Sequence, residues 1–278
     1  MTQDVKLTPD DISRLTAAIE HVGTVEFPES FCTFCASIAG ADAVYLNAFF
    51  DADRPAEIYS TRTGAETLDA LALYLDVAFV LDPFYKLFQA KTGDRVDGLR
   101  DIAPDDFRRS EYYAMFFRAL KINDECGVML HLTDEAALFL SLGIRDTSRL
   151  HVARLRAFLP AIGALARRHW TVLTPDHFDG SGRLAAHLDR AFEAFGSKVL
   201  SPREGEIARM ILQGHSSKSI AINFDNSPET IKVHRRRIYT KLGVASQGEL
   251  LSLFLTALRR MPTTATGDPL EYLDISSH

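Results

Sequence analysis

The feature that most constrains this fold is a repeated helix-start signal in the C-terminal third of the chain. Ser201 and Ser227 each precede a proline, and an acidic residue follows within the first helical turn. Serine caps free backbone N–H groups, proline fits the first helical position, and the helix dipole favours a nearby acid. Gly214 ends the first helix, and Asp225-Asn226 tolerates the backbone of a tight turn. The pattern predicts short helices joined by tight turns over residues 200–243.

The middle helix of this segment begins at Ser216 or Ser217, and the third helix has two contrasting faces. Its apolar stripe recurs at spacings of three and four and consists of Ile231, His234, Ile238 and Leu242. Its basic face consists of Lys232, Arg235, Arg236, Arg237 and Lys241, with Val233 among them. Such a face offers cations to phosphates and guanidinium groups to base edges. It predicts a DNA-binding helix-turn-helix, although a run of charges alone is more often a solvated face.

A fourth, apolar helix is expected from Ser246 through Leu255, and the four helices together resemble a known family. Residues 197–258 resemble the DNA-binding domain of LuxR-type regulators, as in FixJ and NarL. The matching positions are Leu200-Ser-Pro-Arg-Glu204, Gly214, Ser216-x-Lys218-x-Ile220-Ala221, Ser227-x-x-Thr230-Ile-Lys-x-His234 and Ile238-x-x-Lys241-Leu-Gly-Val244. The chain departs from the family at Asp225-Asn226, Ser219 and Ala208, which puts the angle between the helices in question.

The resemblance implies separate roles for the DNA-facing residues. Base edges in the major groove would be read by Lys232, Val233 and Arg236. The DNA backbone would be held by Ser216, Lys218, Thr230, Arg235 and Lys241. One short recognition helix covers only half a site, so a homodimer on a palindromic double-stranded operator is expected, with RNA polymerase as a further partner if the protein is an activator.

The charge balance changes sign along the chain. Residues 197–260 contain eleven Lys and Arg against five Asp and Glu, whereas residues 1–196 contain twenty against twenty-nine. The basic segment attracts a polyanion, and the acidic remainder limits non-specific binding. The larger part of the chain must therefore have another role.

Length and composition predict two domains in a soluble protein. The 278 residues, 46% of them hydrophobic, can bury two cores. No apolar run is long enough to span a bilayer, and no signal peptide is evident, so a cytoplasmic location without membrane contact is expected. Cys32 and Cys35 form a Cys-x-x-Cys among apolar residues, with Cys126 far away in sequence. We expect these thiols to be core side chains rather than a redox or metal site, and we expect no cofactor.

The first 172 residues mix helices and strands. The expected helices are Pro9–His21, Pro28–Ala39, Glu66–Val80, Pro104–Leu120 and Ser148–Trp170. The expected strands are Ala43–Phe50, Ala56–Thr61, Glu125–Leu132 and Ala136–Ile144. Pro83 ends the helical pattern, and a Gly/Asp-rich loop follows. The expected fold is an α+β domain, in which an antiparallel sheet has flanking and inserted helices, followed by an all-α four-helix domain.

This order of elements resembles a GAF or PAS-like sensor domain, which would bind a small-molecule effector between the sheet and its inserted helices. The candidate lining residues are the aromatics of those elements, Tyr45, Phe49, Tyr85, Phe88, Tyr113 and Phe116, with Asp82 or His131 as polar anchors. Plain core packing is the alternative for each of them. Acyl-homoserine-lactone receptors use two tryptophans and a tyrosine in the pocket, whereas Trp170 is the single tryptophan of this chain. The sequence therefore argues against an acyl-homoserine lactone as the effector. A receiver domain is disfavoured because the chain begins with two helices.

The expected domain plan has four parts: a sensor domain over 1–172, a linker and possible dimerisation helix over 173–196, the DNA-binding domain over 197–260, and a flexible tail over 261–278. The linker helix carries Leu184, Leu188, Phe192 and Phe195 on one face, which would pair with a second subunit or pack on its own domain. The expected protein is a ligand-controlled transcriptional regulator and not an enzyme. Two alternatives stay open: a constitutive DNA binder, and an enzyme fused to an autoregulatory DNA-binding module, for which no catalytic motif is found.

Overall fold

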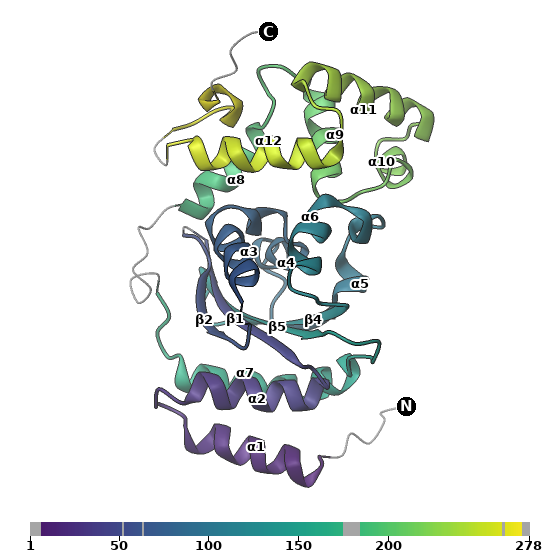
Figure 1. Cartoon of the computed structure of the whole chain (residues 1–278). Coiled ribbons are helices and arrows are strands. Elements are labelled where there is room, and N and C mark those ends of the chain that lie inside the picture. Colours follow the sequence, from purple (N-terminus) through teal and green to yellow (C-terminus); the bar gives the residue numbers. More distant parts are fainter. Residues whose placement is uncertain (1–6, 52, 63, 175–183, 263–264, 274–278) are drawn as a thin grey trace.

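The computed structural model describes residues 7–51, 53–62, 64–174, 184–262 and 265–273. They stack in layers along one axis (Figure 1): an outer layer of helices, a β-sheet, a second layer of helices, and a helical C-terminal domain. The N-terminal part is α+β with an antiparallel sheet and the C-terminal part is all-α, so the predicted fold class is confirmed. No helix among the described residues combines the length and apolarity needed to cross a membrane.

Five antiparallel strands form the sheet, in the order β2-β1-β5-β4-β3. They are β1 Ala43–Phe50, β2 Ala56–Ser60, β3 Arg95–Gly98, β4 Asp124–His131 and β5 Ala136–Ile144. The long central pair β1 and β5 runs in register from Ala43 opposite Gly143 to Phe50 opposite Ala136. Successive side chains of a strand point to opposite faces. Every residue of this pair is buried, so both faces of the sheet are covered.

Two helices cover one face of the sheet, α2 Phe27–Ala39 and α7 Val152–His169, and α1 Pro9–Glu20 packs on α2 on the side away from the sheet. Thr8 begins α1 with a reciprocal capping box, in which its side chain and that of Asp11 each accept a backbone N–H. The buried Asp11 carboxylate also accepts hydrogen bonds from Ser37 of α2 and Arg154 of α7. One carboxylate therefore ties all three helices together.

The three cysteines lie in the core between this layer and the sheet. Cys32, Cys35 and Cys126 are each fully buried and unpaired. Burial raises the pKa of each thiol, which disfavours the reactive thiolate. The prediction that they are core side chains is confirmed.

Seven short elements cover the opposite face: α3 Ala65–Asp76, η1 Ala78–Leu81, α4 Pro83–Gln89, α5 Leu99–Ile102, η2 Phe107–Arg109, α6 Glu111–Tyr113 and the π-helix η3 Ala114–Arg118. Aromatic rings fill the space beneath them. Phe49 of β1 stacks on Phe139 of β5 with centroids 5.3 Å apart, and Tyr85 and Phe88 of α4 pack on Phe49 at 5.3 and 5.5 Å.

Three predictions for this part of the chain were wrong. The expected helix 104–120 is broken, because the extended backbone of Ser110 interrupts it and the Ser110 side chain accepts from the N–H of Tyr113 to begin a new helix. The expected break at Pro83 is instead the start of α4, since proline fits the first helical turn and the Asp82 carboxylate caps the N–H of Phe84. Strand β3 and helix α5 stand where a loop was expected.

The C-terminal domain contains α8 Leu184–Ala194, α9 Pro202–Leu212, α10 Ser217–Asn223, α11 Pro228–Leu242 and α12 Gln247–Arg260. The serine side chain of each predicted cap accepts the expected backbone N–H, at Ser201, Ser216, Ser227 and Ser246. Asp225 adopts φ 50°, the left-handed backbone that its turn was predicted to need. The local signals of this domain therefore placed its helices correctly.

The apolar side chains along α8 that the structure describes are buried within this chain, while the side chain of Leu184 lies outside the described residues. Leu188, Phe192 and Phe195 are at most 2% exposed. Phe192 and Phe195 pack on Phe254 of α12 with centroids 5.4 and 5.2 Å away. Asp189, on the other side of α8, accepts from Tyr85 Oη at 3.0 Å. Of the two alternatives for this helix, the structure has packing on its own domain.

The expected flexible tail is wrong for residues 265–273, which pack against α8 and α12. They form the short η5 helix Pro269–Tyr272. The fully buried Asp268 carboxylate accepts from the backbone N–H groups of Gly196 at 2.9 Å and Lys198 at 3.0 Å. A single turn is too short to show an apolar period, so the sequence pattern could not indicate it. Residues 175–183 of the expected linker lie outside the described residues.

Candidate functional sites: a basic helix face and a buried polar pocket

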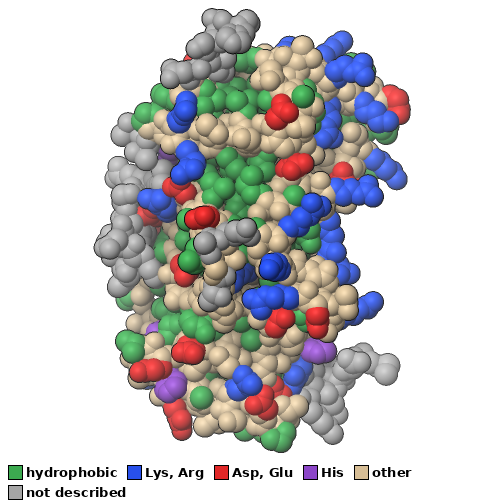
Figure 2. Space-filling model, in the orientation of Figure 1, with side chains coloured by type: hydrophobic (Ala, Val, Ile, Leu, Met, Phe, Trp, Pro, Cys, Tyr) green, Lys and Arg blue, Asp and Glu red, His purple; other side chains and the backbone are tan. Residues whose placement is uncertain are grey.

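Helix α11 presents the basic face that the sequence predicted. Ile231 and Ile238 are buried against the domain core, while Lys232, Arg236 and half-exposed Val233 point to solvent. Blue side chains gather along the upper right edge of Figure 2, where Figure 1 places α10 and α11. The exposed pair between Lys232 and Glu229 is long, 3.4 Å between Nζ and Oε1. Lys232 is thus only weakly held.

Two of the predicted DNA-backbone residues bind other side chains of the domain. Arg235 donates from Nε to Tyr239 Oη at 2.9 Å and from Nη2 to Gln247 Oε1 at 3.0 Å. Lys241 Nζ lies 2.6 Å from Oε2 of Glu204, and this bond lowers the pKa of Glu204 to about 2. Both residues brace α11 against α9 and α12.

The other predicted backbone residues lie at the starts of α10 and α11. Lys218 is exposed. The Thr230 hydroxyl hydrogen-bonds the Ser227 hydroxyl at 2.9 Å, within the first turn of α11. The Ser216 N–H donates to Asp105 Oδ1 at 3.0 Å, and the Ser216 hydroxyl donates to Asp105 Oδ2. Asp105 belongs to the N-terminal domain, so Ser216 is engaged across the two domains.

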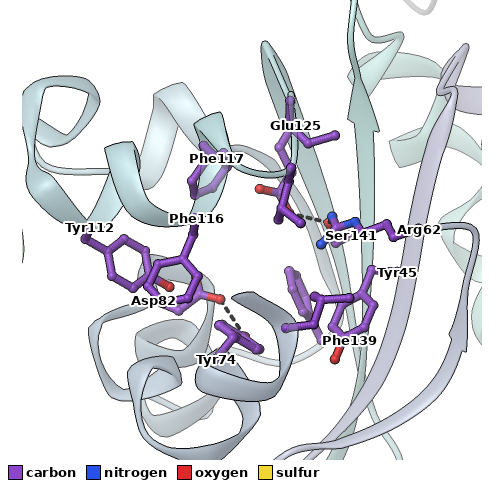
Figure 3. A pocket seen from close by; sticks show the side chains of 13 residues that line it. Tyr45, Arg62, Tyr74, Asp82, Tyr112, Phe116, Phe117, Glu125, Phe139 and Ser141 are labelled. Carbon is purple, nitrogen blue, oxygen red and sulfur yellow. Dashed lines mark hydrogen bonds between the residues drawn. The ribbon is translucent and has the colours of Figure 1, made fainter. Parts of the chain in front are cut away.

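A pocket lies on the sheet face that α3, α6 and η3 cover (Figure 3). Its cavity volume is about 40 Å³. Its apolar wall consists of Leu71, Phe116, Phe117, Leu120, Ile122 and Phe139, and its polar groups belong to Tyr45, Arg62, Tyr74, Asp82, Tyr112, Glu125 and Ser141. A cavity of this size has room for about three water molecules. The pocket is small, and its polar groups come from segments far apart in the sequence.

On the sheet side of the pocket three polar residues form a chain. Arg62 Nη2 donates to Ser141 Oγ at 3.2 Å, and the Ser141 hydroxyl in turn donates to Oε1 of Glu125. Burial raises the pKa of Glu125 to about 7, although the Arg62 charge opposes that rise. The carboxyl group therefore titrates near neutral pH.

On the helix side, the Asp82 carboxylate is held by two donors. Tyr74 Oη donates to Oδ2 at 2.7 Å, and the N–H of Phe84 donates to Oδ1 at 2.8 Å. Burial raises the pKa of Asp82 to about 6, and these hydrogen bonds oppose the rise. Asp82 is both the cap of α4 and part of the pocket wall, so the local fold fixes its position.

One buried donor at the sheet side, Nε of Arg62, has no hydrogen-bond partner among the described residues. The hydroxyl of Tyr45 makes no short hydrogen bond there either, although the Asn47 side chain on the same strand interacts with it and opposes the rise in its pKa that burial causes. The guanidinium carbon lies 5.0 Å from the centre of the Tyr45 ring, so the two groups are neighbours. Buried polar groups are nearly always paired, since an unpaired one loses its hydration without compensation. Arg62 Nε can therefore donate to an acceptor that enters the pocket.

The structure brings only some of the predicted pocket residues together. Tyr45, Asp82 and Phe116 line the pocket. Phe49, Tyr85 and Phe88 pack in the neighbouring aromatic core, and Tyr113 stacks on Phe117 with centroids 4.8 Å apart, outside the lining set. His131 lies at the end of β4 against Phe88.

Sequence reasoning found Asp82 but missed the other polar residues of the sheet side of the pocket, Arg62, Glu125 and Ser141. Arg62 follows β2. Glu125 of β4 is paired with Gly143 and Ser141 of β5 with Gly127, so Glu125 and Ser141 are diagonal neighbours on adjacent strands. A carboxylate within a strand otherwise made of apolar residues was the signal that could have found Glu125. Among the described residues, no group of three His, Cys, Asp or Glu side chains could hold a metal ion.

Comparisons with known proteins agree with the helical C-terminal domain. Residues 198–254 match the family model of bacterial regulatory proteins, luxR family. An HTH-type transcriptional regulator encoded in the exeN 3′ region of Aeromonas salmonicida is 31% identical over 161 residues, which are 55% of this chain and 82% of that protein. FixJ of Bradyrhizobium diazoefficiens, a transcriptional regulatory protein, is 41% identical over 58 residues, 21% of this chain and 28% of FixJ.

A solved structure supports the fold of the N-terminal domain. The LBD domain of VqsR from Pseudomonas aeruginosa matches with a TM-score of 0.51 and 22% identity, covering 60% of this chain and 100% of that chain. This similarity concerns the fold alone. The relatives are transcriptional regulators, and none of the matches indicates an enzyme family. With its four capped helices and its exposed basic helix face, the chain belongs to the luxR family of bacterial regulatory proteins and is a DNA-binding transcriptional regulator.

Proposed function

We propose that this regulator responds to a small molecule bound in the pocket between the sheet and α3, α6 and η3. The observation that carries the proposal is the unpaired Nε of Arg62, whose guanidinium lies over the ring of Tyr45 in the pocket. Two raised carboxyl pKa values in the same pocket, at Glu125 and Asp82, point the same way, since perturbed groups gather at functional sites. Burying carboxyl groups costs desolvation free energy, so a core formed only for stability would be expected to have apolar side chains at these positions.

The donors of Arg62 and Tyr45 define what the effector must offer. Both Arg62 Nε and the Tyr45 hydroxyl can donate, so the effector supplies an oxygen acceptor such as a carbonyl or carboxylate. Phe116 and Phe139 supply apolar surface for its body. Trp170 packs with Phe27 and Phe31 on the opposite face of the sheet. The absence of tryptophan from the described pocket lining supports an effector other than an acyl-homoserine lactone.

The small cavity suggests how binding reaches the DNA-binding domain. An effector larger than a few atoms must move the pocket wall, and Phe116 packs on Tyr112 with tilted rings and centroids 4.7 Å apart. Tyr112 in turn packs on Phe107 at 5.8 Å, next to the loop that contacts the DNA-binding domain. We propose that the effector acts through these neighbouring aromatic rings.

The output is recognition of double-stranded DNA by α11. We propose that base edges are read by Lys232, Val233 and Arg236, and that phosphates are held by Lys218 and Thr230. Three further residues can bind phosphates only after they give up their present hydrogen-bond partners: Ser216, Arg235 and Lys241. A homodimer is proposed because one recognition helix covers a half-site. Its interface lies away from the apolar side chains of α8 that are buried within the chain.

The test is to identify a bound molecule and then remove its proposed donor. Protein purified from cells is denatured, and the released small molecules are identified by mass spectrometry. The identified compound should raise the melting temperature of the wild type, and Arg62→Met should abolish that rise. Arg54→Met is the matched control, because Arg54 pairs with Asp76 at 3.1 Å outside the pocket. An equal response in Arg62→Met would contradict the pocket, and no response of the wild type to co-purified compounds would favour constitutive DNA binding.

A further inference from the structure

A loop of the N-terminal domain is hydrogen-bonded to the DNA-binding domain at the start of α10. We call residues Asp105–Glu111 the clasp. Asp105 accepts from both the N–H and the hydroxyl of Ser216, and the N–H of Asp106 donates to the carbonyl oxygen of Gly214 at 3.2 Å. In Figure 1 this contact lies where α10 approaches the region of α5 and α6. Backbone and side-chain groups of both domains are thus paired across one boundary.

Two glycines of the DNA-binding domain make room for the clasp. Gly214 has φ 91°, and a Cβ built there would lie 2.9 Å from the Cα of Phe107. A Cβ on Gly248 would lie 3.2 Å from the Glu111 carboxyl carbon. Gly214 therefore serves two purposes, since it ends α9 and also lets the backbone of the other domain approach. The close approach at two separate points indicates a specific docking surface.

The clasp places a negative charge beside the DNA-binding face. Partial burial alone would raise the pKa of Asp105, but the hydrogen bonds from Ser216 outweigh it and hold the pKa below its ordinary value. Asp105 is therefore ionised at neutral pH. Its carboxylate uses the N–H and the hydroxyl of Ser216, the same groups that are proposed to bind a DNA phosphate. A phosphate would have to displace a like charge to reach them.

We propose that the clasp is an intramolecular docking surface that competes with DNA, so that the conformation described is a closed state in which Ser216 is withheld from the duplex. The exposed side of α11 stays open to DNA in this state, so closure weakens binding without abolishing it. Full binding requires Asp105 to leave Ser216. The inference rests on the proposed phosphate contact of Ser216 and is independent of the effector.

The experiment compares full-length wild type with Asp105→Ala on a short mixed-sequence DNA duplex, by fluorescence anisotropy over a series of salt concentrations. Loss of a charged hydrogen-bond acceptor should raise the affinity on the order of tenfold at low salt. Ser216 carries no charge, so the phosphate contact that it gains adds no cation and should leave the dependence of log affinity on log salt nearly unchanged. Asp105→Ala should therefore bind more tightly than the wild type, with a similar slope. Asp105→Asn, which keeps an acceptor without the charge, should fall between the two.

Asp106→Ala is the matched control. It removes one negative charge from the neighbouring position, while the backbone N–H that binds Gly214 is retained. Equal effects of the two alanine variants would overturn the inference, because a general loss of negative charge would then explain both. Weaker binding by Asp105→Ala would also overturn the inference, because the clasp would then assist DNA binding. Loss of binding in Lys232 and Arg236 variants tests the DNA-binding face separately.

Discussion

The basic face of α11 and the pocket around Arg62 both gather charged side chains, but in opposite surroundings. On α11 the Lys232 side chain is 66% exposed and its partner Glu229 is 75% exposed, so water screens both charges. In the pocket Glu125 and Asp82 are at most 8% exposed, and burial raises their pKa values to about 7 and about 6. A charged side chain therefore loses little hydration free energy on α11 and much more in the pocket. An exposed charged side chain is therefore weak evidence for a functional site, whereas a buried one is stronger evidence.

The largest effect is expected at the exposed face, where the double variant Lys232→Ala, Arg236→Ala removes both proposed base-reading cations. Each base contact contributes about 1 to 3 kcal/mol of discrimination, so preference for a selected operator over mixed DNA should fall at least about 30-fold. The operator is first obtained by selection from a random library with the wild type. The circular dichroism spectrum should not change, because both side chains are exposed.

Arg260→Ala provides the control for that variant, since Arg260 is an exposed cation at the end of α12. It should keep the selectivity of the wild type. If the double variant selects the same operator sequence as the wild type, α11 is not the recognition helix.

The DNA-binding face could be predicted from the sequence because its signals are local. Ser201 and Ser227 begin helices through atoms within three residues, and the two faces of α11 follow from the helical period. What the sequence did not indicate was the engagement of Ser216 by Asp105, which lies 111 residues away along the chain. A contact between domains leaves no trace in a local pattern.

The second effect concerns the pocket and depends on pH. Because the folded-state pKa of Glu125 is raised from 4.5 to about 7, its neutral form is favoured in the folded protein. The free energy of unfolding should therefore fall as pH rises from about 4.5 to 7, by about 1 kcal/mol per pH unit for this group. Glu125→Gln keeps an acceptor for the Ser141 hydroxyl and cannot ionise, so it should flatten this decline in chemical denaturation.

The control is Glu135→Gln, on the exposed turn between β4 and β5. It should reproduce the pH profile of the wild type. A Glu125→Gln profile as steep as that of the wild type would mean that Glu125 is ionised in the folded pocket across this range, and the contrast with the surface charges would be lost.

The pocket was harder to predict than the DNA-binding face because its members come from β1, α3, α6, β4 and β5. Aromatic content pointed to the correct layer but could not separate Phe116, which lines the cavity, from Tyr85, which packs beside it and binds Asp189. Arg62 follows a strand with no motif around it. Its role depends on the sheet register that brings Ser141 within 3.2 Å of its guanidinium.

A smaller effect separates the two pocket tyrosines. Tyr74→Phe removes a 2.7 Å hydrogen bond to buried Asp82 and should lower the free energy of unfolding by about 1 to 2 kcal/mol. Tyr45→Phe removes a hydroxyl that makes no short hydrogen bond among the described residues and should leave stability unchanged or slightly raised. Urea denaturation measures both. Equal losses in the two variants would show that the Tyr45 hydroxyl is paired, which would remove one donor from the proposed effector site.

The smallest effect is expected for the exposed ion pair of α11. Glu229→Ala should change the free energy of unfolding by less than about 0.5 kcal/mol, because solvent screens the 3.4 Å pair with Lys232. Glu249→Ala, also in the first turn of a helix, is the contrasting variant. Its carboxylate accepts from the N–H of Ala245 at 2.8 Å, so its loss should cost about 1 kcal/mol. Thermal denaturation of both variants tests the difference. If Glu229→Ala were as destabilising as Glu249→Ala, Lys232 would be held by its ion pair with Glu229. Lys232 would then be less free to reach a base edge, which would count against its proposed role in reading DNA.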